Sequence, residues 1–230
     1  IEESPVVKAF IQLLNIHQSR FTLTEVLEIF SVPDVLSRFK VAESELEILQ
    51  HWLRQSGIRW GINGQDKLRW ELPEESQNTW LFGLRRLLCG YAMGQGSDVL
   101  KSDDGEEIAP YVEPEGQQVE VLGKFIEFIS SLELILQQAN QSATLVAKTK
   151  MAENWLALLF DVSESQHYYC QQILDSLARL SEHARQYPDD IDQDVFAEAV
   201  KQQLSSKGVG QRFLADKINF CTLMPMRSIP

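Results

Sequence analysis

The stretch LGKFIEFISSLELIL, residues 122–136, decides the fold class of this sequence. Its apolar residues recur every three or four positions: Leu122, Phe125, Ile126, Ile129, Leu132 and Leu136. That spacing places them on one face of an α-helix, where they pack into a core. Similar stripes, two of them preceded by the capping residues Ser4 and Thr22, run through most of the chain. The sequence therefore predicts a mainly α, bundle-like fold.

Two segments depart from the helical period. Residues 58–72, IRWGINGQDKLRWEL, have short apolar runs around the turn signal Asn63-Gly64. They predict a small β-hairpin with Trp60 and Trp70 at related positions on its arms. Residues 217–230, KINFCTLMPMRSIP, read as an isolated C-terminal strand.

Charge is distributed unevenly along the 230 residues, which carry a net charge of −12. Residues 98–120 hold eight carboxylates against one lysine, a net of −7, and Gly94 to Gly116 is predicted to be an acidic, solvated loop. Residues 206–230 hold four cations against one carboxylate, a net of +3. Because most of the chain is acidic, we expect the helical body to make mainly protein contacts and no continuous DNA groove.

The absence of certain sequence features limits the compartments and the chemistry that can be expected of this chain. No apolar run reaches the roughly 18 residues of a membrane span, and three distant cysteines fit a reducing cytoplasm. Phosphate-loop, serine-hydrolase and zinc-protease motifs are absent, and the four histidines stand apart. We therefore expect no catalytic residue, no metal site, no cofactor and no membrane contact in this sequence.

Arg85 and Arg86 are the candidate DNA contacts within the predicted helix at residues 78–93. Adjacent helical residues point in different directions. One arginine can therefore pair with an acidic neighbour while the other meets a phosphate.

The C-terminal stretch resembles a motif of superfamily one helicases, T-x-H-x-A-K-G-x-E, which contacts single-stranded DNA. Thr222 falls on its threonine and Arg227 on its lysine, whereas Met224 and Ser228 replace the histidine and the glycine. With three further stretches the chain resembles the RecC family, the exodeoxyribonuclease V gamma chain of RecBCD enzymes. These stretches are residues 20–39, 57–62 and 78–93.

The resemblance implies an internal fragment of a longer subunit that keeps a helicase-like shape without helicase chemistry. Residues 1–40 would enter the second motor-like subdomain, residues 41–208 would form its helical 2B-like insertion, and residues 209–230 would be the return strand. Thr222 and Arg227 would contact DNA. The implied partners are RecB-like and RecD-like motor subunits, with DNA bound through the full-length subunit. The implied roles are assembly, strand guidance and a contribution to Chi recognition.

Two other interpretations remain open from the sequence. The chain could come from an active ATP-dependent helicase whose phosphate loop lies upstream of Ile1. It could also be an acidic all-α module that binds proteins and has no link to the helicase motif. Enzymatic activity is therefore undecided, because the sequence lacks a catalytic or ATP-binding motif but resembles a subunit of an ATP-dependent nuclease.

Overall fold

The computed structural model describes residues 4–94, 99–101, 105, 107–112, 119–184 and 187–206. Its helices are α1 (Pro5–Leu14), α2 (Leu23–Phe30), α3 (Pro33–Arg38), α4 (Leu46–Gln55), α5 (Trp80–Met93), α6 (Val119–Ala139), α7 (Leu145–Leu159), α8 (Glu164–His183) and α9 (Gln193–Ser206). Three short 3-10 helices are η1 (Ile16–Gln18), η2 (Glu43–Glu45) and η3 (Gln65–Trp70). The strands are β1 (Leu100–Lys101), β2 (Glu107–Ile108), β3 (Ala143–Thr144) and β4 (Asp190–Ile191). The predicted mainly α fold is confirmed.

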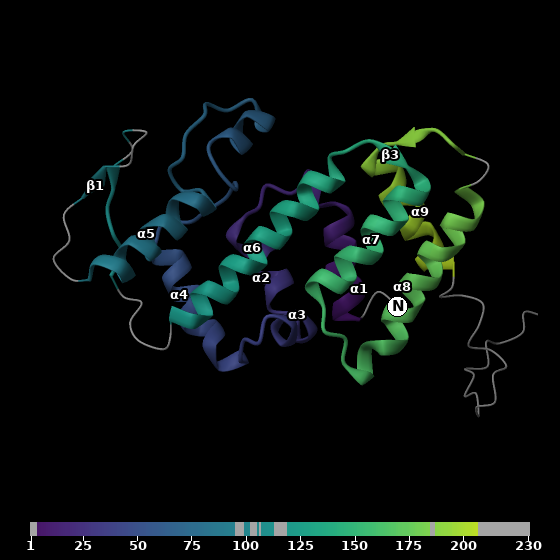
Figure 1. The fold of residues 1–230 in the computed structure, drawn as a ribbon, viewed down its shortest axis with the longest axis horizontal. Coiled ribbons are helices and arrows are strands. Elements are labelled where there is room, and N and C mark those ends of the chain that lie inside the picture. The colour runs from purple at the N-terminus through teal and green to yellow at the C-terminus, as the bar shows by residue number, and fades with distance from the viewer. Residues whose placement is uncertain are drawn as a thin grey trace, which may run out of the picture.

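Helix α6 is the centre of the architecture. It crosses the middle of the molecule, with α4 and α5 on one side and α7, α8 and α9 on the other (Figure 1). The predicted apolar stripe is buried except for Ile126, which is partly buried. The buried residues of α6 are Val121, Leu122, Phe125, Phe128, Ile129, Ser131, Leu132, Ile135, Leu136 and Ala139. One hydrophobic cluster extends from α1 to α9.

Aromatic rings fix how α6 meets the N-terminal helices. Phe30 of α2 lies 4.9 Å from Phe125 and 4.8 Å from Phe128, measured between ring centroids. Phe39 packs edge-on against Phe128 at 5.5 Å. Such pairs stabilise a fold by about 0.5–1.5 kcal/mol beyond the burial of their area. The core is therefore continuous across residue 40, and the predicted division of the chain at that residue stays a prediction.

The local signals for helix starts were partly right. Thr22 and Glu25 form the predicted capping box: Thr22 Oγ1 accepts from Glu25 N, and Glu25 Oε2 accepts from Thr22 N. Ser44 and Glu47 have the same spacing and also predict a capping box, but that prediction is wrong, because η2 occupies residues 43–45 and Glu45 Oε2 accepts from Ala42 N.

The β-hairpin predicted near 58–72 is wrong, because η3 occupies that segment. Asn63 Oδ1 accepts from Asp66 N, and Asp66 Oδ2 accepts from Ile62 N. Lys67 Nζ donates to the carbonyl oxygen of Gln77 at 2.8 Å. These side chains satisfy the backbone groups that a hairpin ladder would have used.

The described strands lie elsewhere. β1 pairs antiparallel with β2, aligning Leu100 with Ile108, inside the stretch that we expected to be an irregular acidic loop. β3 pairs antiparallel with β4 and joins the start of α7 to the start of α9. The predicted C-terminal strand lies outside the described residues.

Helix α3 was missed, because Pro33 was interpreted only as a stop for the preceding helix. Proline suits the first turn of a helix, and Pro33 opens α3 at that position. The next residue, Asp34, is buried, and its Oδ1 accepts from Ser163 N at 2.7 Å. A side chain from α3 thereby caps the N-terminus of α8, 129 residues further along the chain.

Candidate functional site

The predicted contact residues fall into two groups. Thr222 and Arg227 lie outside the described residues. Arg85 and Arg86 lie on α5, as expected. Around α5 and the segment that precedes it, the structure brings together two surfaces with distinct chemistry.

Arg86 is partly exposed, and its guanidinium is held by two hydrogen bonds within the protein. Its Nε donates to the carbonyl oxygen of Ala109 at 2.8 Å, and its Nη1 donates to that of Ser56 at 2.7 Å. The carbonyl oxygen of Arg86 accepts from Tyr111 N at 3.0 Å. The residue therefore joins the end of α4 and the segment after β2 to α5. Among the described residues, its guanidinium therefore bonds backbone carbonyls and no acidic neighbour.

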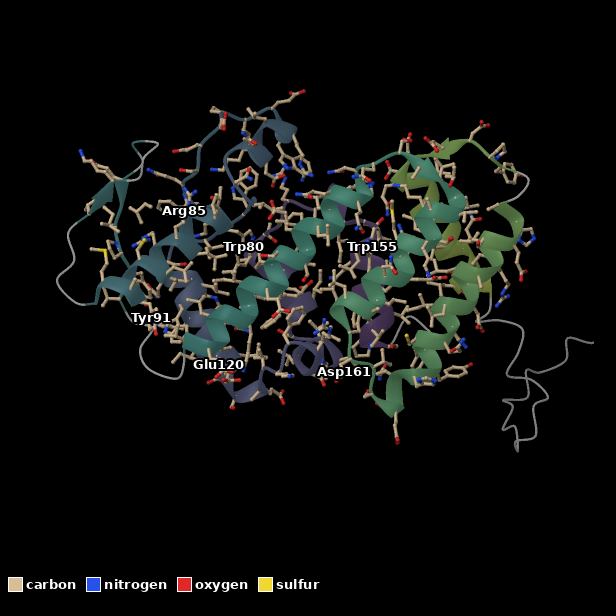
Figure 2. The ribbon with its side chains drawn as sticks, in the orientation of Figure 1. Trp80, Arg85, Tyr91, Glu120, Trp155 and Asp161 are labelled. Atoms are coloured by element: carbon tan, nitrogen blue, oxygen red, sulfur yellow. The ribbon has the colours of Figure 1, made fainter. Side chains whose placement is uncertain are left out.

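Arg85 is also partly exposed, but it lies at a groove that Arg86 does not line. It lines a groove of about 180 Å³ between α5 and α6 (Figure 2). The groove is mostly apolar: Ile62, Trp80, Leu81, Leu84, Leu88, Ile126 and Ile129 contribute its walls, and Arg85, Ser130 and Glu133 its polar groups. DNA contact by Arg85 or Arg86 stays a prediction.

The groove exposes large apolar side chains. Leu81 is 41% exposed and Leu88 is 44% exposed. They are seven residues apart, so they lie on one side of α5. Trp80, which also lines the groove, is buried and packs against Phe125 of α6 with 5.7 Å between ring centroids. We call this feature the α5–α6 groove.

The second surface is formed by residues 19–23, 54–61 and 65–70. Leu23 N donates to the carbonyl oxygen of Arg59, and Gly61 N donates to that of Arg20, both at 2.9 Å. The Arg20 guanidinium lies 4.8 Å from the centroid of the Trp70 ring, and that of Arg69 lies 5.9 Å from it. We call the exposed part the arginine–tryptophan surface: Arg20, Arg54, Arg59, Trp60, Arg69 and Trp70.

Sequence reasoning missed this surface. The signal was present as two arginine–tryptophan dipeptides, Arg59-Trp60 and Arg69-Trp70, ten residues apart. The hairpin interpretation accounted for the tryptophans as cross-strand neighbours and left the cations without a role. Arg20 comes from a distant stretch, and only tertiary structure brings it to Trp70.

A further cavity of about 280 Å³ lies between α1, η1, α2 and α6. Its walls include Phe21, Val26 and Leu132, with the Glu25 carboxylate at the edge. That carboxylate accepts from Thr22 N at 2.8 Å and from Ser19 Oγ at 3.2 Å. Its hydrogen bonds serve the cap of α2, so we assign no chemistry to this cavity.

One buried titratable group stands out in the helical body. Lys148 is fully buried, and its Nζ donates to the carbonyl oxygen of Ala139 at 3.0 Å and to Gln193 Oε1 at 3.1 Å. Burial lowers the pKa of this lysine, and the nearby charge of Asp192 opposes that shift. Lys148 satisfies the last carbonyl of α6 and ties it to the start of α9. This is a structural role.

Among the described residues there is no group of three or more histidine, cysteine, aspartate or glutamate side chains that could hold a metal ion. No helix in the described ranges combines the length and hydropathy that a bilayer crossing requires.

These features define a mainly α-helical domain whose notable surfaces suit contacts with other macromolecules. The chain matches the family model "RecBCD enzyme subunit RecC fourth domain" over residues 3–208, and it belongs to that family. The predicted resemblance to RecC is confirmed.

Relatives from three bacteria align with the whole chain. It is 34% identical over 240 residues to RecBCD enzyme subunit RecC of Escherichia coli K12 and 29% identical over 238 residues to that of Haemophilus influenzae. It is 27% identical over 234 residues to that of Mycobacterium tuberculosis H37Rv. In each case 100% of this chain is covered and 20% of the relative, so the chain spans about a fifth of their length.

Proposed function

We propose that this chain is a non-catalytic structural domain of a RecBCD-type DNA-repair complex, the exodeoxyribonuclease V of the bacterial cytoplasm. Its task is to hold RecB-like and RecD-like motor subunits and to help guide single strands. Recognition of Chi belongs to the subunit as a whole, and DNA is bound through the full-length subunit. Family membership supports the assignment to the complex.

The α5–α6 groove carries the assembly part of this proposal. Burial of its exposed leucines against a partner would stabilise the complex by about 25 cal/mol per Å² of apolar surface removed from water. Arg85 and Glu133 give its rim one charge of each sign, which can fix the register of a partner helix. An apolar helix face laid between α5 and α6 satisfies both requirements.

The test replaces Leu88 with aspartate in the full-length subunit and measures assembly with the two motor subunits by size-exclusion chromatography. Leu88→Asp places a charge in the groove, and we expect assembly to weaken by at least about tenfold, equivalent to about 1.4 kcal/mol. Leu134→Asp is the matched control, because Leu134 is 45% exposed on α6 and does not line the groove. Equal assembly of the parent and both variants would refute the role of the groove.

A further inference from the structure

The arginine–tryptophan surface is positively charged within an acidic chain. Residues 54–70 hold four cations, Arg54, Arg59, Lys67 and Arg69, against the single carboxylate of Asp66, a net of +3. The whole chain has a net charge of −12. Asp66 is buried and paired with Arg69 Nε at 2.8 Å, so the exposed, uncompensated charges of this segment are those of Arg54 and Arg59.

Arg69 and the Trp60 ring are positioned before any ligand arrives. Arg69 is fixed by Asp66 and by the carbonyl oxygen of Ser19, which accepts from its Nη2 at 3.2 Å. Lys67 is buried and lies 5.5 Å from the centroid of the Trp60 ring, which holds that ring in place. The side chains of Arg69 and Trp60 would therefore lose little conformational entropy on binding.

Two arginines on this surface keep their hydrogen-bonding capacity. Arg20 is exposed, its guanidinium lies against the Trp70 ring, and that guanidinium makes no hydrogen bond or ion pair with the described residues. Arg54 is also exposed at the last turn of α4. A guanidinium offers a phosphate two parallel N–H donors.

Trp60 and Trp70 are more exposed than the other three tryptophans of the chain. Trp52, Trp80 and Trp155 are each 1% exposed, whereas Trp60 and Trp70 are partly exposed. Nucleic-acid bases stack on indole rings and on guanidinium planes, and the bases of a single strand are accessible for such stacking. An acidic peptide would use the arginines but would gain little from the rings.

We propose that the arginine–tryptophan surface binds a short segment of single-stranded nucleic acid, with Arg20 and Arg54 on phosphates and Trp60 and Trp70 beside bases. The inference rests on the strand-guiding part of the proposed function and gives it a location. Glutamates 71, 74 and 75 follow the surface in sequence, and Glu74 and Glu75 pack beside Gly64. They would limit the bound segment to a few nucleotides.

Photochemical cross-linking tests this proposal on the full-length subunit, assembled with its motor partners. The probe is an oligothymidine strand containing 4-thiothymidine. Trypsin cleaves after Arg59, Lys67, Arg69 and Arg85, so residues 60–67 and 70–85 leave as separate peptides, each beginning with a candidate tryptophan. We expect cross-links in both peptides, with yields that fall as salt is raised.

The double variant Arg20→Ala/Trp70→Ala should lower both yields by at least about fivefold, because one stacking contact and one phosphate contact are removed. Arg38→Ala is the matched control. Its guanidinium lies 5.7 Å from the Phe39 ring centroid, outside this surface, and its loss should leave the yields unchanged. If the double variant fails to assemble, Arg20→Gln replaces it and should lower the yield of the 70–85 peptide.

Three results would overturn the proposal: no cross-link in either peptide, equal yields in parent and variant, or competition by polyglutamate as strong as that by unlabelled oligothymidine. The last would identify an acidic protein segment as the ligand. A complex that assembles and gives any of these results leaves the groove's role standing. Normal assembly of Leu88→Asp would instead remove the groove's role and leave the cross-linking result intact.

Discussion

Replacing Gly90 with alanine should destabilise the domain, although alanine is the better helix former. A Cβ atom built on Gly90 would overlap the carbonyl carbon and oxygen of Tyr111 and would lie 3.0 Å from its amide nitrogen. Non-bonded heavy atoms rest about 3.5–4.0 Å apart. The segment after β2 must therefore move away from α5.

The magnitude follows from what that movement breaks. Tyr111 N donates to the Arg86 carbonyl oxygen at 3.0 Å, and Arg86 Nε donates to the Ala109 carbonyl oxygen at 2.8 Å. Each bond contributes about 1 kcal/mol, and overpacking costs about 1–3 kcal/mol. Alanine returns at most about 1 kcal/mol of helix propensity. We expect a net loss of about 2–4 kcal/mol in the free energy of unfolding.

Gly123→Ala is the matched control, since Gly123 is exposed on α6 and a Cβ there would meet nothing within 4 Å. It should raise stability by about 0.5–1 kcal/mol. Urea denaturation followed by circular dichroism measures both changes. The two midpoints should move in opposite directions. If Gly90→Ala were as stable as the parent or more so, the close packing of Tyr111 on α5 would be refuted.

Two further predictions concern buried polar groups. Asp34→Ala should lower the free energy of unfolding by about 1–2 kcal/mol in urea denaturation, because Ser163 N loses its acceptor at the start of α8. Asp34→Asn keeps an acceptor oxygen and should retain most of the stability. Lys148 has a lowered pKa in the folded state. Between that pKa and the ordinary lysine pKa of about 10.4, the unfolded chain therefore binds more protons than the folded chain. In this pH window the free energy of unfolding, compared with that of Lys148→Met, should rise with pH. The check is to measure the urea midpoints of the parent and of Lys148→Met from pH 7 to 10. A constant difference between the two midpoints across this range would contradict the prediction.

The helices of the core could be predicted from the sequence because their evidence is local and repeated. In α6 the three- and four-residue spacing of Leu122, Phe125 and Ile129 leaves one face apolar, and burial follows from it. The capping box of Thr22 and Glu25 likewise involves residues only three apart. In both cases the residues that decide the structure are also the residues that show the pattern.

The errors arose where distant groups compete for the backbone. Asn63-Gly64 is a strong turn signal, yet Asp66 and Lys67 bond the surrounding backbone and produce η3. Ser163 precedes a helix, as expected, but Asp34 supplies the cap from α3. A sequence pattern shows that a polar side chain is available to bond, but not which distant backbone group it will reach.

The same limit explains the candidate surfaces. Arg85 and Arg86 were predicted to differ, because adjacent helical residues diverge, but the Ser56 and Ala109 carbonyls that hold Arg86 come from two other segments. The arginine–tryptophan surface needs Arg20 from a third. Contact surfaces of this kind are assembled by tertiary structure and leave only fragments in the sequence.

Helix α5 connects the two surfaces, and this makes their roles separable. Its Leu81 and Leu88 line the α5–α6 groove, while Arg86 binds the carbonyl of Ser56, where the chain leaves α4 towards Trp60. A substitution in the exposed wall of the groove leaves the bonds of Arg86 in place, so it should affect assembly without moving the arginine–tryptophan surface. Loss of Arg86 itself would free the start of that segment and the segment after β2 together. For this reason Leu88 and Arg20 separate the two functions, whereas substitution of Arg86 would confound them.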